Sequence, residues 1–298
     1  MRRKVKLTIL TPIYNRVDLL PQVFTSLQSQ TVKDFEWLVI DDGSTDNIQE
    51  YMHGLPEVDF PIHYHRKENG GKHTAMNYSH PYIQGEFVLI LDSDDYLIPD
   101  AVEIILKDWQ KYVGVSSVGV LSYERGGRQG EIISDRASVP NYYISDDIHF
   151  RVNQGVGGDR AEVVRTEIFK TLPLPTHENE KFMSEGWLWN NIAIKYQTVY
   201  IQKGIYICEY LEGGLTKSGR ILRMKSPLNM MDSCKSFFQD EVCLKIQVKE
   251  MLLYCVYGLC SNLPIHKWLH NSGRPLRVLL TLPFGWLLFK YWKYKYSF

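Results

Sequence analysis

Short, continuously apolar runs alternate with segments of helical periodicity over about the first 125 residues, and this alternation constrains the fold most strongly. Apolar runs without polar alternation are typical of strands that are covered on both faces. The sequence therefore predicts an α/β fold, with a mostly parallel central sheet flanked by helices. Strands are expected at residues 5–11, 35–40, 62–65, 87–91 and 117–123, and helices at 17–29, just after 46, at 71–80 and at 99–112.

Polar segments follow three of the expected strands, at residues 11–15, 41–46 and 92–95. In open parallel sheets ligands bind beyond the carboxyl ends of the strands, so these segments are expected to share one edge. The last of them is Asp92-Ser93-Asp94-Asp95, which places three carboxylates within four residues. Their repulsion is relieved by protonation or by a hard divalent cation, and the cation explains them better at neutral pH.

Composition narrows the possible classes of partner. The chain has 298 residues, of which 44% are hydrophobic, and its 34 basic residues balance its 34 acidic ones. This balance argues against binding of bulk polyanions, so nucleic acid is not expected as a partner. The five cysteines show no CxxC pair and indicate reduced thiols in a cytoplasmic protein. The apolar stretch after the basic start is too short for a signal peptide.

The rest of the chain is less regular. Residues 124–183 are expected to form loops that frame a second subsite, followed by a helix at 187–196 and two short strands within 198–210. Glycines flank a cationic stretch at 213–220, which indicates a mobile loop. Its Lys217 and Arg220 are either phosphate contacts or solvent-facing charges.

Two helical segments are expected near the C-terminus, from 227 to about 259 and from 275 to 298. The last is rich in leucine and aromatic residues, ends in lysines, and falls short of the roughly 20 apolar residues that span a bilayer. An interfacial helix at the inner face of the cell membrane fits it, and packing on a partner subunit is the alternative. We expect a domain at 1–222, with halves at about 1–125 and 126–222, and a helical region at 223–298.

Several motifs recur in order: TILTPIYNR at 8–16, QT at 30–31, FEWLVIDDGSTD at 35–46 and DSDD at 92–95. Together they resemble the family 2 glycosyltransferases of GT-A fold over about residues 5–125. The segments EGWLW at 185–189 and EYLEGGLT at 209–216 resemble the bacterial surface-polysaccharide branch of that family.

The resemblance implies a nucleotide-sugar site. It makes Asp42 the acceptor of a hydrogen bond from the base, usually uracil, and makes Asp94 a direct ligand of Mn²⁺ or Mg²⁺, with Asp92 as ribose or water-mediated contact. The expected nucleotide-sugar residues are Pro12, Tyr14, Asp42, Asn69, Lys72, Asp92 and Ser93, and the expected metal residues are Asp94 and Asp92.

The chemistry of sugar transfer supports these roles independently of the resemblance. A divalent cation stabilises the charge that grows on the departing β-phosphate, which makes Asp94 a candidate catalytic residue through the metal. The acceptor hydroxyl must lose a proton to a general base. The resemblance places this base at Glu185, although Gly186 replaces the usual aspartate after it. The rival bases are His177, Glu178, Glu180 and Asp159, and the expected acceptor contacts are Trp187 and Trp189.

The sequence thus predicts an inverting hexosyl- or N-acetylhexosaminyltransferase that uses a nucleotide diphosphate-sugar, most often UDP-linked. Its acceptor is expected to be a hydroxyl of a glycan or lipid-linked oligosaccharide in cell-surface polysaccharide synthesis, such as capsule. A sugar nucleotidyltransferase is the alternative enzyme, but its Gly-rich phosphate loop is missing after the first strand. A non-catalytic glycan-binding subunit is the other alternative.

Overall fold

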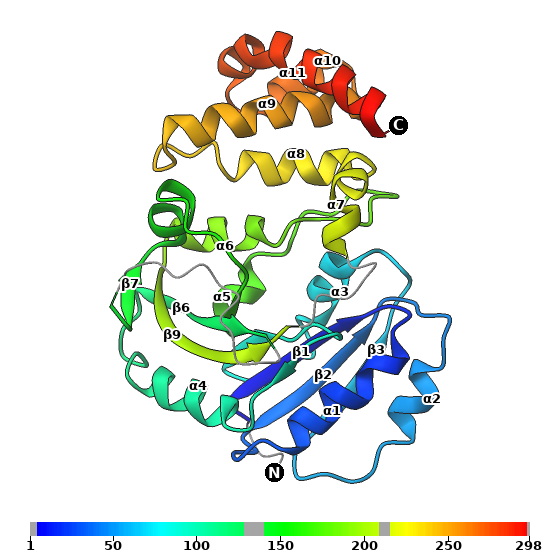
Figure 1. Cartoon of the computed structure of the whole chain (residues 1–298), viewed down its shortest axis with the longest axis vertical. Coiled ribbons are helices and arrows are strands. Elements are labelled where there is room, and N and C mark those ends of the chain that lie inside the picture. The colour runs from blue at the N-terminus through cyan, green and yellow to red at the C-terminus, as the bar shows by residue number, and fades with distance from the viewer. Residues whose placement is uncertain (1–4, 128–139, 209–214, 297–298) are drawn as a thin grey trace. The chain divides into compact units, whose positions relative to one another are not determined.

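The computed structural model describes residues 5–127, 140–208 and 215–296. The chain divides into two compact units (Figure 1). The first comprises residues 1–146, 156–173 and 195–211, and the second comprises 147–155, 174–194 and 212–298. Each unit is described by itself.

One mixed sheet forms the centre of the first unit. Within the described residues it has nine strands in the order β3-β2-β1-β4-β8-β6-β9-β5, and β7 pairs with β9. The strands β3, β2, β1 and β4 are parallel neighbours, as the sequence predicts. The strands are β1 (Leu7–Ile13), β2 (Phe35–Asp41), β3 (Ile62–Arg66), β4 (Phe87–Ile90), β5 (Tyr96–Leu97), β6 (Val118–Gly126), β7 (Tyr143–Ser145), β8 (Arg160–Arg165) and β9 (Gln197–Ile207).

Helices cover both faces of this sheet. On one face α1 (Leu20–Gln28), α2 (Ile48–His53) and α4 (Ala101–Gln110) share one hydrophobic core with alternate strand residues. Two other helices, α3 (Lys72–Ser79) and α5 (Thr166–Thr171), contact the strands without joining that core, so they cover the opposite face (Figure 1). Every residue of β1 and β2 is consequently buried.

The strand β8 corrects the expectation that residues 124–183 form only loops. It lies between β4 and β6 and runs antiparallel to both. Its sequence hides it because arginines begin and end it. The guanidinium of Arg160 is nevertheless buried, and it donates to the Ser122 hydroxyl (2.9 Å) and to the carbonyls of Ser122 (3.0 Å) and Ile201 (3.1 Å). Backbone acceptors thus satisfy a charge inside the sheet.

Three other expectations need correction. The two short strands expected within 198–210 are one long strand, β9, whose register against β6 shifts at several points. Residues 215–220 belong to a helix, α7 (Leu215–Met224), rather than to a loop, whereas residues 213 and 214 lie outside the described residues. The helix expected from 227 to 259 is divided into α8 (Pro227–Lys235) and α9 (Leu244–Cys260).

Side chains stabilise the break between α8 and α9. The Gln247 amide donates to the carbonyls of Gln239 (2.9 Å) and Val242 (2.7 Å), and the Asn153 side chain accepts from the Cys243 N–H (2.7 Å). These bonds replace those of a continuous helix.

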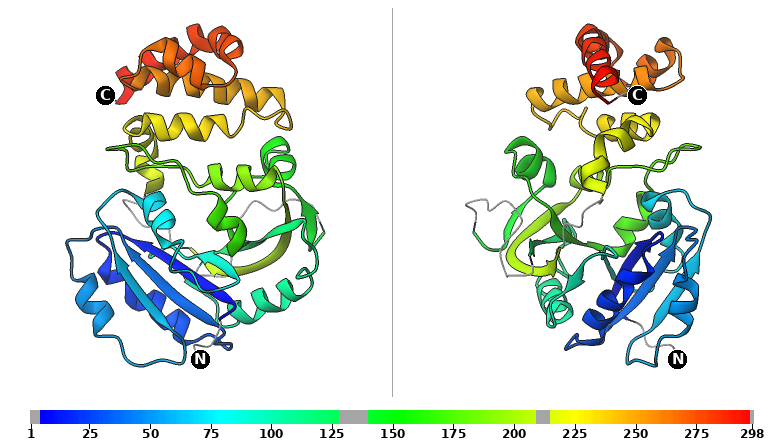
Figure 2. Two further views of the ribbon diagram at one scale, coloured as in Figure 1. Left: turned by 180° about the vertical axis from the view of Figure 1, so that it is seen from behind. Right: turned by 45° about the vertical axis from the view of Figure 1, so that its right-hand side comes forward.

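The second unit is helical within its described residues. Its other elements are a short π-helix (Ile148–Asn153), α6 (Gly186–Ala193), α10 (Ile265–Asn271), which the sequence did not predict, and α11 (Pro275–Tyr296). The helices α9 and α11 lie side by side (Figure 2). They approach closely at Gly285, where an added Cβ would lie 2.5 Å from that of Cys255.

The helix α11 buries one face and exposes another. Val278, Gly285 and Trp292 are buried toward α9. No helix of the described residues is both long and apolar enough to cross a bilayer. The opposite side of α11 carries a stripe of exposed large side chains at helical spacing, which we call the α11 stripe: Leu276, Leu280, Phe284, Leu287, Tyr291 and Tyr294.

Candidate active site

The carboxyl ends of β2, β1 and β4 form one edge of the sheet, because these strands are parallel neighbours. The Asp42 N–H donates to the Ile13 carbonyl (2.8 Å), and the Leu91 N–H donates to the Leu10 carbonyl (2.8 Å). The polar segments that follow the three strands therefore start side by side, as the sequence predicts.

The segments after β1 and β2 are joined by hydrogen bonds. Asn15, in a left-handed conformation (φ 50°), accepts the Thr45 N–H at 2.7 Å, and its own N–H donates to the Ser44 hydroxyl (2.9 Å). Pro12 lies within β1, and the Tyr14 side chain is 45% exposed. An exposed phenol beside a fixed turn is available to contact a ligand.

The two adjacent aspartates after β2 have different surroundings. Asp41 holds the turn, since it accepts the Ser44 N–H (2.8 Å) and the Tyr64 hydroxyl (2.7 Å). Gly43 allows the turn because it adopts φ 78°. An added Cβ at this position would lie 2.7 Å from the backbone nitrogen of Asn69. The turn therefore packs directly against the segment that follows β3.

That segment encloses the Asp42 carboxylate, which is 3% exposed. Oδ1 accepts from the Lys67 ammonium (2.7 Å) and from the Gly70 N–H (3.0 Å), while Oδ2 accepts from the Gly71 N–H (2.6 Å) and from the Asn69 amide (3.2 Å). Gly71 adopts φ 95°, which glycine tolerates, at the residue before α3. Four close donors thus fill the roughly four lone-pair positions of this carboxylate, and the Thr74 hydroxyl lies farther away, at 3.5 Å from Oδ1.

Asp92 and Asp94 both have cationic partners. The Lys72 ammonium pairs with Asp92, and the Arg16 guanidinium pairs with Asp94 at 2.8 Å. The Asp92 N–H also donates to the Tyr206 hydroxyl (2.8 Å). Burial opposes ionisation of Asp92, but the charges of Lys72, Arg125 and Arg16 outweigh it and hold its pKa below the usual value. Lys72, one of the expected nucleotide-sugar residues, therefore lies at the acidic segment.

The third carboxylate of the segment differs from the other two. Asp95 is buried, and its burial together with the charge of Asp92 raises its pKa to about 7. Arg125, at the end of β6, lies 3.7 Å from it, and the Cys208 thiol lies at the same distance. Ser93 is buried as well. Among the acids of this segment, Asp92 and Asp94 are thus the better candidates for contact with a ligand.

The donor set suits a hard divalent cation. No group of three or more His, Cys, Asp or Glu residues in the described parts of the chain forms a metal-binding cluster. Mg²⁺ and Mn²⁺ are commonly held by one or two carboxylates together with substrate phosphates, rather than by a protein cage. Asp92 and Asp94 supply such oxygens, and positive groups already lie against both. The two carboxylates therefore fit a metal that arrives with a nucleotide.

Glu185, Trp187 and Trp189 belong to the second unit. Glu185 directly precedes α6 and is half-buried, and both tryptophans are half-buried on that helix. Trp187 lines a cavity that Trp189 does not line. This agrees with the helical geometry, in which residues two apart point in different directions.

The four other candidates for the general base differ in burial and in hydrogen-bond partners. Glu180 caps α8, since its carboxylate accepts the N–H groups of Leu228 (2.8 Å) and Asn229 (2.7 Å). His177 lies 2.8 Å from the Asp232 carboxylate, whereas Glu178 and Asp159 are exposed. A capping role thus accounts for Glu180 without any chemistry.

Sequence reasoning gave no role to Arg16, Lys67, Arg125 or Tyr206. Arg16 follows the polar segment after β1, and Lys67 directly follows β3, so the positions of both near strand ends were a usable signal. Arg125 and Tyr206 reach the acidic segment through the pairing of β6 with β9, which had no signal in the sequence.

The comparisons agree with this geometry. The fold is that of the GT-A glycosyltransferases. It resembles the crystal structure of Staphylococcus aureus TarS 1–349 in complex with UDP-GlcNAc, with a TM-score of 0.61 and 18% identity, over 86% of this chain and 72% of that one. It also resembles the mannosyltransferase PcManGT from Pyrobaculum calidifontis in complex with GDP-Man and Mn²⁺, with a TM-score of 0.57 and 15% identity, over 98% and 87% of the two chains.

The family follows from the sequence. The family described as Glycosyl transferase family 2 matches residues 8–166, and this chain belongs to it. A relative, the glycosyltransferase GlyA of Streptococcus pneumoniae serotype 4, is 35% identical over 225 residues, which are 71% of this chain and 32% of that protein. The chain spans about a third of the length of the first curated relatives it matches.

Proposed function

We propose that this chain is an inverting glycosyltransferase that transfers a sugar from a nucleotide diphosphate-sugar to a hydroxyl of a glycan or lipid-linked oligosaccharide in cell-surface polysaccharide synthesis. One observation carries the proposal: the enclosed Asp42 and the carboxylates of Asp92 and Asp94 follow neighbouring parallel strands at one edge of the sheet. Inversion means that the acceptor oxygen attacks as the nucleotide diphosphate departs, without a covalent enzyme intermediate.

Asp92 and Asp94 would hold Mn²⁺ or Mg²⁺ together with the diphosphate. Such an ion, when bound, stabilises negative charge on the departing phosphate. Arg16 and Lys72, which would be freed from the two carboxylates, carry the charge to contact phosphate oxygens themselves. Without a ligand, the two side chains neutralise the charge of Asp92 and Asp94. When a nucleotide is bound, they contact its diphosphate.

Asp42 would accept the N–H of a uracil ring, which makes UDP the proposed nucleotide. Because four donors already occupy its carboxylate, one of them must move. The Asn69 amide makes the longest of these four bonds (3.2 Å) and also donates to the Asp42 carbonyl (2.9 Å), so it can leave the carboxylate at least cost. Pro12 and Tyr14 would border the base.

Glu185 would act as the base that accepts the proton of the acceptor hydroxyl. Its position at the start of α6 favours a carboxylate, and the rival Glu180 is occupied by two backbone N–H groups. Glu185→Gln should keep nucleotide binding and lose transfer. Normal transfer by this variant would assign the base to another acid.

The α11 stripe supports a cytoplasmic enzyme bound peripherally to the inner membrane face. Leu276 and Leu280 are each 77% exposed, and Tyr294 is 87% exposed. Large apolar side chains gathered on one exposed face mark an interaction surface. Lys290 and Lys293, on the same helix, suit an anionic lipid surface, so a membrane accounts for the face better than a partner subunit does.

Vesicle flotation tests the membrane proposal. Deletion of α11 would also strip Val278 and Trp292 from the core, so substitution of the stripe is cleaner. The triple variant Leu276→Gln/Leu280→Gln/Leu287→Gln should bind vesicles of anionic phosphatidylglycerol about 100-fold less, at about 1 kcal/mol per leucine. Leu244→Gln, also exposed, is the control. Equal binding by the triple variant and the control would refute the proposal.

Product analysis separates the enzymatic alternatives. With UDP-sugars and Mn²⁺ the protein should release UDP slowly when water is the only acceptor of the sugar. The release of UDP should be faster when an acceptor glycan is present. Release of pyrophosphate from a sugar phosphate and UTP would instead identify a nucleotidyltransferase, and silence with every donor would favour a glycan-binding subunit. Asp94→Asn should abolish metal-dependent release, whereas Asp59→Asn, at an exposed acid, should not change it. Full activity of Asp94→Asn would show that Asp94 is not a ligand of the metal.

A further inference from the structure

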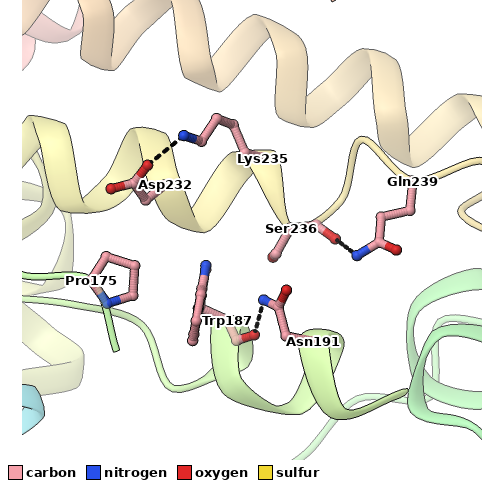
Figure 3. A pocket seen from close by; sticks show the side chains of 7 residues that line it. All are labelled: Pro175, Trp187, Asn191, Asp232, Lys235, Ser236 and Gln239. Carbon is pink, nitrogen blue, oxygen red and sulfur yellow. Dashed lines mark hydrogen bonds and ion pairs between the residues drawn. The ribbon is translucent and has the colours of Figure 1, made fainter. Parts of the chain in front are cut away.

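The second unit contains a cavity of about 300 Å³, and Trp187, one of the two tryptophans expected to contact the acceptor, lines it (Figure 3). Trp187 and Asn191 reach it from α6, while α8 contributes Asp232 and Lys235. Residues from both helices and from the segments that flank them line it: Pro175, Trp187, Asn191, Asp232, Lys235, Ser236 and Gln239. All of these residues belong to one compact unit. The volume is at the lower end of the range for ligand pockets.

An aromatic ring stands among polar groups in this cavity. In Figure 3 the Trp187 ring is seen edge-on, with Pro175 on one side and Ser236 and Asn191 on the other. The face of an indole ring is apolar and electron-rich, and its N–H is a hydrogen-bond donor. A ligand with an apolar face and a polar rim therefore matches this wall.

Several hydrogen-bonding groups of the lining remain available. The Asn191 amide donates to the Trp187 carbonyl (2.7 Å), and the Gln239 amide donates weakly to the Ser236 carbonyl (3.4 Å). Among the described residues, no partner occupies the carbonyl oxygens of these two side chains or the indole N–H of Trp187. The lining residues thus carry two acceptors and one donor that have no partner among the described residues.

The charges in the cavity are balanced. The Asp232 carboxylate pairs with the Lys235 ammonium (2.7 Å) on one oxygen and with the His177 ring (2.8 Å) on the other. An anionic ligand would have to draw Lys235 away from Asp232, and a cationic ligand would meet Lys235 itself. The lining therefore favours a neutral ligand with many hydroxyl groups.

We propose that this cavity binds one neutral or N-acetylated pyranose residue of a glycan, with its C–H face against Trp187 and its hydroxyls bonded to Asn191 and Gln239. The choice of a glycan rests on the proposed function, since the acceptor of such an enzyme is a saccharide. Trp187 thereby becomes an acceptor contact together with α8, whereas Trp189, which lies outside the lining, does not.

Ligand-observed NMR on the full chain tests the proposal. The probes are the methyl β-glycosides of glucose, galactose, N-acetylglucosamine and N-acetylgalactosamine, added at up to about 10 mM, which detects weak complexes. Saturating UDP and Mn²⁺ are present in a parallel set, so that a sugar in the nucleotide-sugar site is displaced while one in the cavity remains. At least one probe should bind in both sets.

Three variants decide which residues are responsible. Trp187→Ala should weaken glycoside binding at least tenfold, while Trp189→Ala, at a half-buried tryptophan of the same helix, should bind as the wild type does. The double variant Asn191→Ala/Gln239→Ala keeps the aromatic ring and should weaken binding severalfold, so it decides the matter if Trp187→Ala does not fold. The proposal is overturned if Trp187→Ala binds the glycosides as tightly as the wild type does. If Trp187→Ala is unfolded, wild-type binding by the double variant overturns the proposal instead.

Two further outcomes are informative. The absence of binding by every glycoside to the wild type, or a preference for methyl glucuronide over the neutral probes, also overturns the proposal. Failure of the protein to bind UDP in a separate thermal-shift measurement would refute the proposed function instead. Glycoside binding without UDP binding would leave the cavity assigned to a saccharide, so the two failures are distinguishable.

Discussion

Replacement of Asp42 by asparagine should destabilise the first unit as well as weaken nucleotide binding. The asparagine side chain carries no charge and has one acceptor oxygen, whereas the carboxylate accepts from four donors. Its amide group would also face the N–H groups of Gly70 or Gly71, as donor against donor. The Lys67 ammonium, whose side chain is only 15% exposed, would lose its counter-charge.

The magnitude follows from these contacts. Removal of one member of a buried ion pair costs about 3–5 kcal/mol. Lys67 retains the Glu68 carbonyl (2.5 Å) and the Thr74 hydroxyl (2.8 Å) as acceptors, which places the effect near the lower bound, at about 3 kcal/mol. For a unit of this size, that loss corresponds to a decrease in Tm of roughly 6–12 °C.

Thermal unfolding followed by circular dichroism measures the loss, with Glu50→Gln as the control because it makes the same chemical change at an exposed position of α2. In a double-mutant cycle, Lys67→Met should cost less in the Asp42→Asn background than in the wild type, by at least about 1 kcal/mol. A decrease in Tm below about 2 °C, or strictly additive effects, would refute the account of a buried ion pair.

Two other predictions concern stability. Burial lowers the pKa of His73 to about 4 from 6.5, so the unfolded chain binds a proton in this interval that the folded chain does not, and stability should fall as pH decreases through it. The variant His73→Gln should flatten this slope relative to the wild type in Tm measurements between pH 4 and 7, and identical slopes would exclude His73 as the cause. Glu180→Ala should lower the stability of the second unit by about 2 kcal/mol in urea unfolding, because two N–H groups of α8 lose their acceptor. Glu180→Gln keeps one acceptor oxygen and should cost less than half as much without affecting transfer; loss of transfer would restore Glu180 as a base.

The sequence predicted well which polar segments meet at one edge of the sheet, because the pattern there is local. Each apolar strand of the β3-β2-β1-β4 portion is followed directly by its polar segment, so Asp42 and Asp94 could be placed at strand ends without knowledge of distant pairings. Of the side chains that donate to Asp42, Asn69 was among the nucleotide-sugar residues that the family resemblance implied, whereas Lys67 was not.

Nonlocal pairing explains what the sequence did not predict. Arg160 and Arg165 frame β8 with charges that distant carbonyls satisfy, so no apolar run marks this strand. The position of Lys72 at Asp92 depends on how α3 begins, at a glycine with positive φ, which periodicity does not resolve. The cavity around Trp187 depends on the pairing of α6 with α8, which are about 40 residues apart in the chain, and neither helix indicates it alone.

The central position of β8 has a consequence for synthesis of the protein. When residue 126 has been added to the growing chain, β4 and β6 are both complete, yet the strand that joins them ends only at residue 165. At translation rates of about 5–20 residues per second this interval lasts roughly 2–8 s, during which both edges present unpaired N–H and C=O groups. The acidic segment after β4 likewise cannot gain its lasting support from β9 until Tyr206 has been added. A fragment that ends near residue 125 should aggregate rather than fold as a separate nucleotide-binding module.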